Sequence, residues 1–119
     1  MQSESLALTD TQSAAVAVAP RVSLANIEAA IGTTHYFTGH QAVVMTGAPG
    51  IPVHPDLRTL TICLIVMKNG FTVIGKAAPA SPENFNADLG RKYAYEDGVR
   101  QLWPHMGFAL RDRLASGAH

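Results

Sequence analysis

The dipeptide Asn69-Gly70 separates two β-branched apolar segments, and this feature most constrains the fold of the chain. Residues 60–67 precede it and residues 71–75 follow it, and both have the composition of strands. Asn-Gly accepts the positive φ angles of a type I′ turn, whose twist matches that of a hairpin. The sequence therefore predicts an antiparallel hairpin around residues 68–71. Residues 60–67 are apolar on both faces, so we expect a central strand or one covered by another subunit.

Two further elements are expected before the hairpin. Ser23 is a candidate N-cap, and apolar residues at helical spacing follow it until Gly32, which predicts a short helix. Residues 35–38 and 41–46 are β-prone and read as a first strand, interrupted near Gly39. Residues 47–55 hold three prolines and two glycines and are expected to form a loop.

Helical sequence follows the hairpin. Ser81, Pro82 and Glu83 combine a cap, a proline for the first turn and an acid for the positive end of the helix dipole. Pro104 lies inside the later apolar pattern, where a proline removes a backbone hydrogen bond. The sequence therefore predicts one helix to about Trp103 and a second from Pro104 to about Leu114.

These elements predict an α+β fold, with a short helix, a small antiparallel sheet and then two C-terminal helices. A length of 119 residues is typical of one domain. Residues 1–20, rich in Ser, Thr, Gln and Ala, are interpreted as a mobile N-terminal tail in which residues 14–19 form a possible docking strand or short helix. Residues 21–116 are interpreted as a single domain. The low charged fraction, 15%, suggests a surface covered by a partner such as another copy of the chain.

Charge and motifs exclude several functions. The net charge is zero, which disfavours a protein that binds duplex DNA. The first 57 residues carry −3 and the remainder +3, so the C-terminal half suits a small phosphate-bearing ligand. The single cysteine, Cys63, lies in an apolar run and is expected to be a buried thiol. The five histidines lack zinc-ligand spacing and no catalytic motif is found, so we expect no metal, no cofactor and no enzymatic activity.

Several side chains are candidates for binding an anion. Five cations occur in the last thirty residues, namely Arg91, Lys92, Arg100, Arg111 and Arg113. They form either a mixed surface with nearby acids or a phosphate clamp, for which arginine is suited. Asn84 and Phe85 lie at the predicted helix start, where free backbone N–H groups attract anions and an aromatic ring can stack on a base. Phe85 is alternatively a core residue, and Lys92 with Glu96 is either a solvated pair or one that fixes an interface.

An ordered set of motifs resembles a family of small tailed-phage proteins. It comprises the strand that ends in Lys68-Asn69-Gly70-Phe71, the start Ser81-Pro82-Glu83-Asn84-Phe85, Gly90-Arg91-Lys92, and Gln101-Leu102-Trp103. The similarity covers about Leu24 to Leu114. This family includes the phage Thoeris anti-defence proteins of the first type, which are oligomers. They bind cyclic ADP-ribose-type signals, and some bind cyclic oligonucleotides, without cleaving them.

The resemblance implies a dimer or higher homo-oligomer with ligand sites between subunits. The matching site positions are Asn84, Phe85, Arg91 and Lys92, with Arg111 and Arg113 as weaker candidates from the C-terminal helix. Three features depart from the family pattern: the long N-terminal segment, the insertion at residues 47–55, and Pro104-His105-Met106.

Three functions remain open from the sequence. The first is a phage anti-defence protein that sequesters a phosphate-containing nucleotide signal in the host bacterial cytoplasm, without membrane or nucleic acid as partner. The alternative is a host-takeover protein that binds a bacterial protein through its apolar strand and loop. The third, a nucleic-acid binder that uses the basic half, is disfavoured by the neutral pI.

Overall fold

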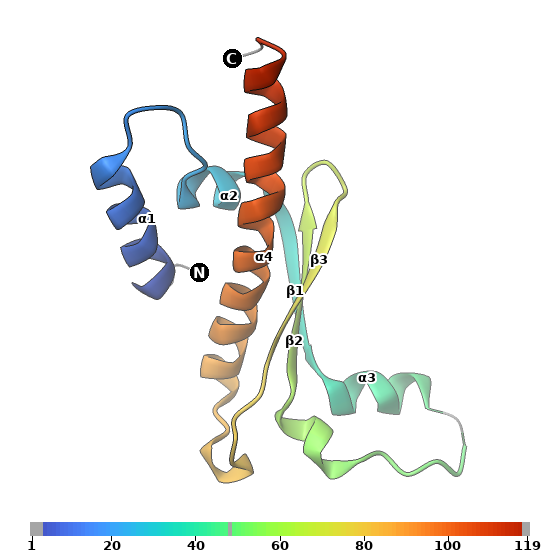
Figure 1. Cartoon of the computed structure of the whole chain (residues 1–119). Helices are drawn as coiled ribbons and strands as arrows, with labels where there is room; N and C mark the ends of the chain where they lie inside the picture. The colour runs from blue at the N-terminus through green and yellow to red at the C-terminus, as the bar shows by residue number, and fades with distance from the viewer. Residues whose placement is uncertain (1–3, 48, 118–119) are drawn as a thin grey trace.

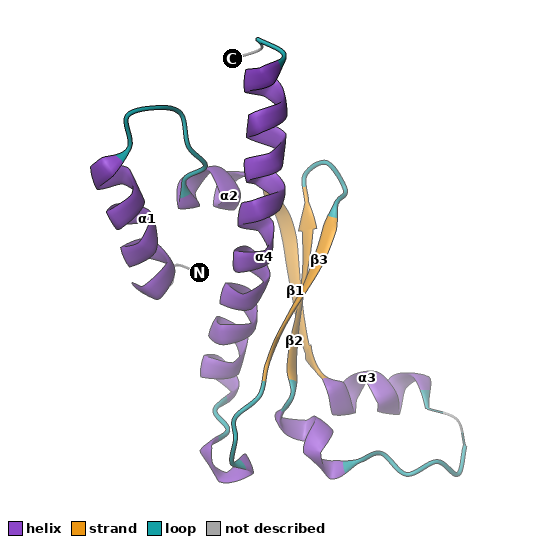
Figure 2. Cartoon of the chain, viewed as in Figure 1, coloured by secondary structure: helices purple, strands orange, loops and turns teal. Residues whose placement is uncertain are grey.

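A three-stranded antiparallel sheet and one long helix across one of its faces form the body of the protein (Figures 1 and 2). The structure is a computed structural model and describes residues 4–47 and 49–117. The strands are β1 (Ile31–Thr38), β2 (Thr61–Met67) and β3 (Thr72–Ala77), in the order β1-β2-β3. The long helix is α4 (Ala87–Ala115). The α+β fold and the central place of β2 are therefore confirmed.

The hairpin between β2 and β3 is confirmed, but its turn is of another type. Only Gly70 has a positive φ, +89°, whereas Asn69 does not. The Gly70 N–H donates to the Met67 carbonyl, and the Met67 N–H donates to the Phe71 carbonyl, both at 2.8 Å. This is a three-residue loop with glycine at its left-handed position, not a type I′ turn. The Asn69 side-chain oxygen accepts the Phe71 N–H at 2.9 Å. This local hydrogen bond holds the turn without a positive φ at Asn69.

The core lies between the sheet and α4. Alternate residues of β2, from Thr61 to Met67, are buried beneath the helix, and the opposite face of the strand is half-buried. Helix α2 (Leu24–Ala30) adds Leu24 and Ile27 to this core. Its predicted Ser23 cap is confirmed, because the Ser23 hydroxyl accepts the Asn26 N–H at 3.0 Å.

Residues after β1 turn into a helix where the sequence predicted more strand. The strand at residues 35–38 is confirmed, but residues 41–46 belong to helix α3 (Gly39–Thr46), so that part of the prediction was wrong. Thr38 and Gln41 explain the difference. The Thr38 hydroxyl accepts the Gln41 N–H at 3.1 Å, and the Gln41 side chain accepts the Thr38 N–H at 2.8 Å. This reciprocal cap begins a helix even in a β-prone segment.

The predicted break at Pro104 is also wrong, because α4 runs through it as one helix. Pro104 is on the exposed side of the helix, where water can reach the carbonyl that loses its N–H partner. The predicted start at Ser81 is instead a short 3₁₀ turn, η2 (Pro82–Asn84), and α4 is capped by Asn86. A second 3₁₀ turn, η1 (Pro55–Thr59), follows the proline-rich loop.

The segment interpreted as a tail forms helix α1 (Glu4–Val16) and packs against α4; residues 1–3 lie outside the described part. Leu6 is only 2% exposed. The Ser5 hydroxyl donates to the buried Glu96 carboxylate at 3.3 Å and accepts from Arg100 at 2.9 Å. An ion pair between Asp10 and Arg21, at 2.8 Å, ties the helix to the linker that follows it. The partners of Ser5 are 91 and 95 positions away in sequence, so local composition did not predict the docking of α1 on α4.

Candidate functional site

The turn before α4 and the start of that helix define the candidate site. Gly90, in the first turns of α4, lies so close to β2 that a Cβ atom there would be 2.5 Å from the Thr61 hydroxyl. This close approach lowers the start of the helix onto the end of the sheet. Phe85, which links η2 to α4, is half-buried there and lines two cavities. We call these the first and the second Phe85 cavity.

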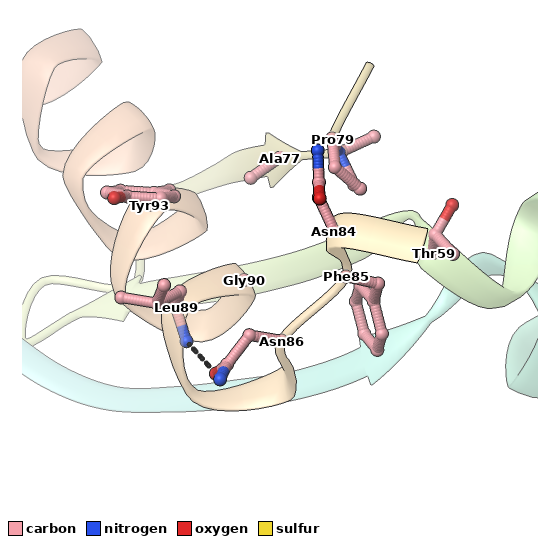
Figure 3. A pocket seen from close by; sticks show the side chains of 10 residues that line it. Thr59, Ala77, Pro79, Asn84, Phe85, Asn86, Leu89, Gly90 and Tyr93 are labelled. Carbon is pink, nitrogen blue, oxygen red and sulfur yellow. Dashed lines mark hydrogen bonds between the residues drawn. The ribbon is translucent and has the colours of Figure 1, made fainter. Parts of the chain in front are cut away.

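The first Phe85 cavity has a volume of about 180 Å³ and lies on the β3 side (Figure 3). Its walls are mostly apolar. They come from the end of η1, the end of β3 and the residues after it, η2 and the first turns of α4: Thr59, Ala77, Ala78, Pro79, Asn84, Phe85, Asn86, Leu89, Gly90 and Tyr93. The Asn86 side chain accepts the Leu89 N–H at 3.0 Å, which holds the helix start in place (Figure 3). Tyr93 is 51% exposed, so its ring is available at the rim.

The second Phe85 cavity has a volume of about 260 Å³ and lies on the β1 side. It is more polar than the first and holds the candidate cation Arg91. Its lining comes from β1, α3, β2 and α4: Tyr36, Phe37, Thr38, Gln41, Thr61, Phe85, Ala87 and Arg91. Phe85 therefore separates an apolar cavity from one with a guanidinium group.

The electrostatics of the second cavity depend on Arg91. Its guanidinium is ion-paired with the exposed carboxylate of Asp88, one turn earlier on α4. An anionic ligand would therefore compete with Asp88 for this arginine. Burial raises the pKa of the Tyr36 phenol in the cavity wall, and its hydroxyl, which lies beside the Cys63 thiol, is protonated at neutral pH. Ala87 belongs to the first turn of α4, where backbone N–H groups have no partner within the helix.

The six residues proposed from the sequence fall into two groups. Asn84, Phe85 and Arg91 line the cavities, and Lys92 follows Arg91 on α4, half-buried and outside both linings. Arg111 and Arg113 are exposed near the other end of α4. A helix rises 1.5 Å per residue, so they lie about 30 Å from Arg91. Within one chain, these arginines are not brought to the Phe85 cavities.

Sequence reasoning missed the residues that come from other elements. Tyr36 and Thr61 reach the site through the pairing of β1 with β2, which no local pattern shows. Gln41 was assigned to a strand, which hid its position at the start of α3. Tyr93 had a usable signal, because it lies four residues after Leu89 and shares its helix face.

The described part of the chain has neither a cluster of metal-ligand side chains nor a membrane-spanning helix. Across residues 4–47 and 49–117, no group of three or more His, Cys, Asp or Glu side chains is placed to hold a metal ion. In the same ranges, no helix has both the length and the apolar character to cross a membrane.

Comparison with known proteins identifies a family. The sequence model described as the phage protein (N4 Gp49/phage Sf6 gene 66) family matches residues 22–114. The match includes β1 to β3 and nearly all of α4, with both Phe85 cavities, and it begins after α1. Neither a curated protein nor a solved structure matches the chain.

Proposed function

The chain belongs to the N4 Gp49/phage Sf6 gene 66 family of phage proteins, and on this premise we propose that it is an anti-defence protein that sequesters a nucleotide-type immune signal. The ligand is a cyclic ADP-ribose isomer or a cyclic oligonucleotide, held without cleavage. The observation that carries the proposal is the placement of Phe85 between an apolar cavity and a cavity containing Arg91. The chain acts in the host bacterial cytoplasm, as a homo-oligomer and not as an enzyme.

The two cavities offer what such a ligand requires. A nucleotide has an apolar base face, a polar base edge and at least one phosphate. Phe85 supplies a ring on which a base can stack, and the exposed Asn84 amide supplies a donor and an acceptor for a base edge. Arg91 supplies a planar cation for a phosphate once Asp88 is displaced. Sequestration needs no further group, because it requires tight binding and slow release only.

Calorimetric titration with cyclic ADP-ribose isomers and a panel of cyclic di- and trinucleotides tests this function, followed by recovery of the ligand. We expect tight binding and a chemically unchanged ligand. Phe85→Ala and Arg91→Ala should each weaken binding by about tenfold or more, as loss of stacking or of a charged hydrogen bond does. Lys68→Ala, in the hairpin turn, is the charge-matched control and should bind normally.

Arg111 and Arg113 are tested separately. If they belong to the site, they must come from another subunit, because about 30 Å separates them from Arg91 along α4. The double variant Arg111→Ala with Arg113→Ala then weakens binding. Unchanged binding would remove both arginines from the proposed site, and no binding by the unmodified protein across the panel would refute sequestration.

A second candidate function rests on a different surface. Helix α3 projects from the end of the sheet (Figure 1), and Val44 and Met45 on it are 55% and 84% exposed. Ile51, in the loop that follows, is 66% exposed. Exposed apolar groups on a projecting element are typical of a protein interface. This surface supports the alternative that the protein binds a bacterial protein of the host.

Purification from host lysate distinguishes the two functions. A stoichiometric protein partner that is lost in the double variant Val44→Ser with Met45→Ser favours the protein-binding function. A nucleotide that copurifies and is lost in Phe85→Ala favours sequestration. The two variants lie at separate surfaces, so each serves as the control for the other.

A further inference from the structure

A third cavity lies at the corner where α2 runs directly into β1. The Ile31 N–H, at the start of β1, donates to the Glu28 carbonyl, so the helix passes into the strand without an intervening loop. The cavity has a volume of about 290 Å³, and Glu28, Thr34, Tyr36 and Tyr95 are among its lining residues. We call it the Tyr95 cavity. It shares Tyr36 with the second Phe85 cavity, but neither Phe85 nor Arg91 lines it.

The Tyr95 cavity exists because α4 covers only part of the sheet. The helix packs mainly on β2 and β3. Thr34 and Tyr36 of β1 are paired with Ile65 and Cys63 of β2, which are fully buried beneath α4. Residues directly opposite each other in a sheet share one face, so Thr34 and Tyr36 are on the α4 side as well. That face of β1 extends past the helix and forms the floor of the cavity.

Tyr95 brings an unused hydroxyl group to this cavity. The residue is only 5% exposed. Within residues 4–47 and 49–117, its hydroxyl takes part in no hydrogen bond, and no polar side-chain atom there is both sealed from solvent and without a partner. The Tyr95 hydroxyl therefore reaches open space, which is the cavity that Tyr95 lines. A largely buried O–H with no partner in the protein points to a bound group that accepts from it.

Glu28 brings an unused acceptor. Its carboxylate is half-buried and forms no ion pair or side-chain hydrogen bond with any other described residue. Burial, and after it the negative charge of Glu28, raise the pKa of the Tyr95 phenol, so the phenol is protonated at neutral pH. The two groups are thus near enough to interact electrostatically, yet they do not bond to each other. A donor and an acceptor face one cavity, and both are free for a third group.

An alcohol hydroxyl is the group that fits between them. It has both a proton and lone pairs, so it can accept from Tyr95 and donate to Glu28. An ammonium group cannot accept the Tyr95 proton, and a phosphate would be repelled by the Glu28 charge. A carboxylate has two oxygens, and the second can accept from an adjacent hydroxyl of the same ligand. Acidic side chains bind the hydroxyls of a ribose in this way.

We propose that the Tyr95 cavity binds the vicinal diol of a sugar ring, with Tyr95 donating to one hydroxyl and Glu28 accepting from both. The volume is close to the lower limit of small-molecule sites, about 300 Å³, which suits a single ring. The sugar is either free or the ribose of a nucleoside, and both have the same diol chemistry. The site goes beyond the sequestration function and does not depend on it.

An NMR titration of the full-length protein tests the site with methyl β-D-ribofuranoside as the probe. We expect amide shifts at the α2–β1 corner and a dissociation constant on the order of 1 mM, because the ligand is small. Methyl 2-deoxy-β-D-ribofuranoside is the matched control, since it lacks one hydroxyl of the diol. It should bind at least about tenfold more weakly. Equal affinity for the two sugars, or no shift at this corner with the riboside, would overturn the proposal.

Two conservative variants test the side chains. Tyr95→Phe removes only the hydroxyl, and Glu28→Gln keeps the shape of the side chain while removing its charge and one acceptor. Each should weaken binding of the riboside by about tenfold. Tyr93→Phe and Asp112→Asn, both at exposed positions on α4, are the matched controls and should bind normally. Normal binding by both Tyr95→Phe and Glu28→Gln would remove the sugar from this cavity.

Thermal stability separates a binding hydroxyl from a structural one. Because the Tyr95 hydroxyl bonds to no other group of the described chain, Tyr95→Phe should leave the unfolding temperature at neutral pH unchanged or raise it, while it weakens sugar binding. A hydroxyl that serves only to hold a structural water would give the opposite result. The unfolding temperature would then fall and sugar binding would not change, which would contradict the proposal.

Adenosine distinguishes the two sources of the diol. If the sugar is the ribose of a nucleoside, adenosine should bind at least about tenfold more tightly than the riboside, and Glu28→Gln should weaken both. If the sugar is free, adenosine should gain nothing over the riboside. Tighter binding of methylammonium than of the riboside would instead indicate a cation site and overturn the proposal.

The riboside also separates this site from the proposed function. It has neither a base nor a phosphate, so Phe85→Ala and Arg91→Ala should leave its binding unchanged. Failure of the riboside to bind would therefore leave the sequestration function standing. Failure of every cyclic nucleotide to bind would likewise leave the diol site standing.

Discussion

Gly75 on β3 and Gly98 on α4 let the long helix lie almost directly on the backbone of the sheet. A Cβ atom on Gly75 would be 1.9 Å from the Ala94 carbonyl oxygen, and one on Gly98 would be 2.6 Å from the Ile65 side chain. Both neighbours are part of the core, and Ala94 is fully buried. The close contact sets the height of α4 above the sheet, and with it the position of Asp97 and Gln101 at the β3 edge.

Gly75→Ala should lower the free energy of unfolding by about 2–4 kcal/mol, because the new methyl group meets backbone that cannot move without shifting α4. Gly107→Ala is the control in the same helix. Apart from its chain neighbours and the backbone of the helix itself, no atom lies within 4 Å of a Cβ at Gly107, so alanine should stabilise α4 by about 0.5–1 kcal/mol. Urea denaturation measures both, and equal effects would contradict the close contact.

Tyr95 gives the protein a pH dependence in the alkaline range. Burial raises the pKa of its phenol to about 12, from the 10.0 that is ordinary for a tyrosine. The unfolded chain thus loses this proton at lower pH than the folded chain. The contribution to stability is complete below about pH 10 and is lost as the pH rises toward 12.

Tyr95→Phe should flatten the fall in stability between pH 10 and pH 12, because it removes the group that titrates. Denaturation midpoints measured across this range test the expectation. Tyr93→Phe is the matched control, since Tyr93 is on the same helix and is 51% exposed. A slope that persists in Tyr95→Phe would assign the pH dependence to another group.

At the scale of elements, α1 is the clearest departure from sequence expectation, and it can be tested on its own. Leu6 is 2% exposed and Leu8 is 59% exposed on the same helix. Leu6→Ala should destabilise the protein by about 2–3 kcal/mol, whereas Leu8→Ala should have an effect within about 0.5 kcal/mol. Thermal or urea unfolding measures both variants. Equal, negligible effects would mean that the segment behaves as the tail expected from its composition.

Local signals predicted the elements whose causes are local. The Ser23 cap, the hairpin around Gly70 and the apolar strand β2 all depend on neighbouring residues, and all were predicted. The errors occurred where a side chain or water at a distance decides the structure. Helix α1 depends on Glu96 and Arg100, and the continuity of α4 depends on the exposure of Pro104.

The candidate site divides in the same way. Asn84, Phe85 and Arg91 were found because they are close in sequence at the start of one helix. Tyr36 and Thr61 were not found, since strand pairing and the close approach at Gly90 bring them there. The sequence predicted a helix break at Pro104, so it did not indicate that Arg111 lies far from the cavities along one continuous helix.

At the scale of the whole molecule, ligand binding should appear as stabilisation. A ligand that binds only the folded state at 100 times its dissociation constant adds about 2.7 kcal/mol. For a chain of this length, we expect the unfolding temperature to rise by about 10 °C. Differential scanning fluorimetry with the cyclic nucleotide panel measures this rise. Phe85→Ala should abolish it, and no rise with any ligand would contradict the sequestration function.

The docking of α1 on α4 also has a consequence for synthesis. The partners of Ser5 are 91 and 95 positions later in the chain, so α1 leaves the ribosome long before its binding surface exists. Strand β1 likewise cannot pair until β2 has been synthesised, although fewer residues separate these two strands. A domain generally folds as a unit, so its contacts form only when the partners at both ends have been made. Helix α1 is synthesised first but docks last. In the nascent chain it is therefore the segment that stays accessible to chaperones and proteases for the longest time.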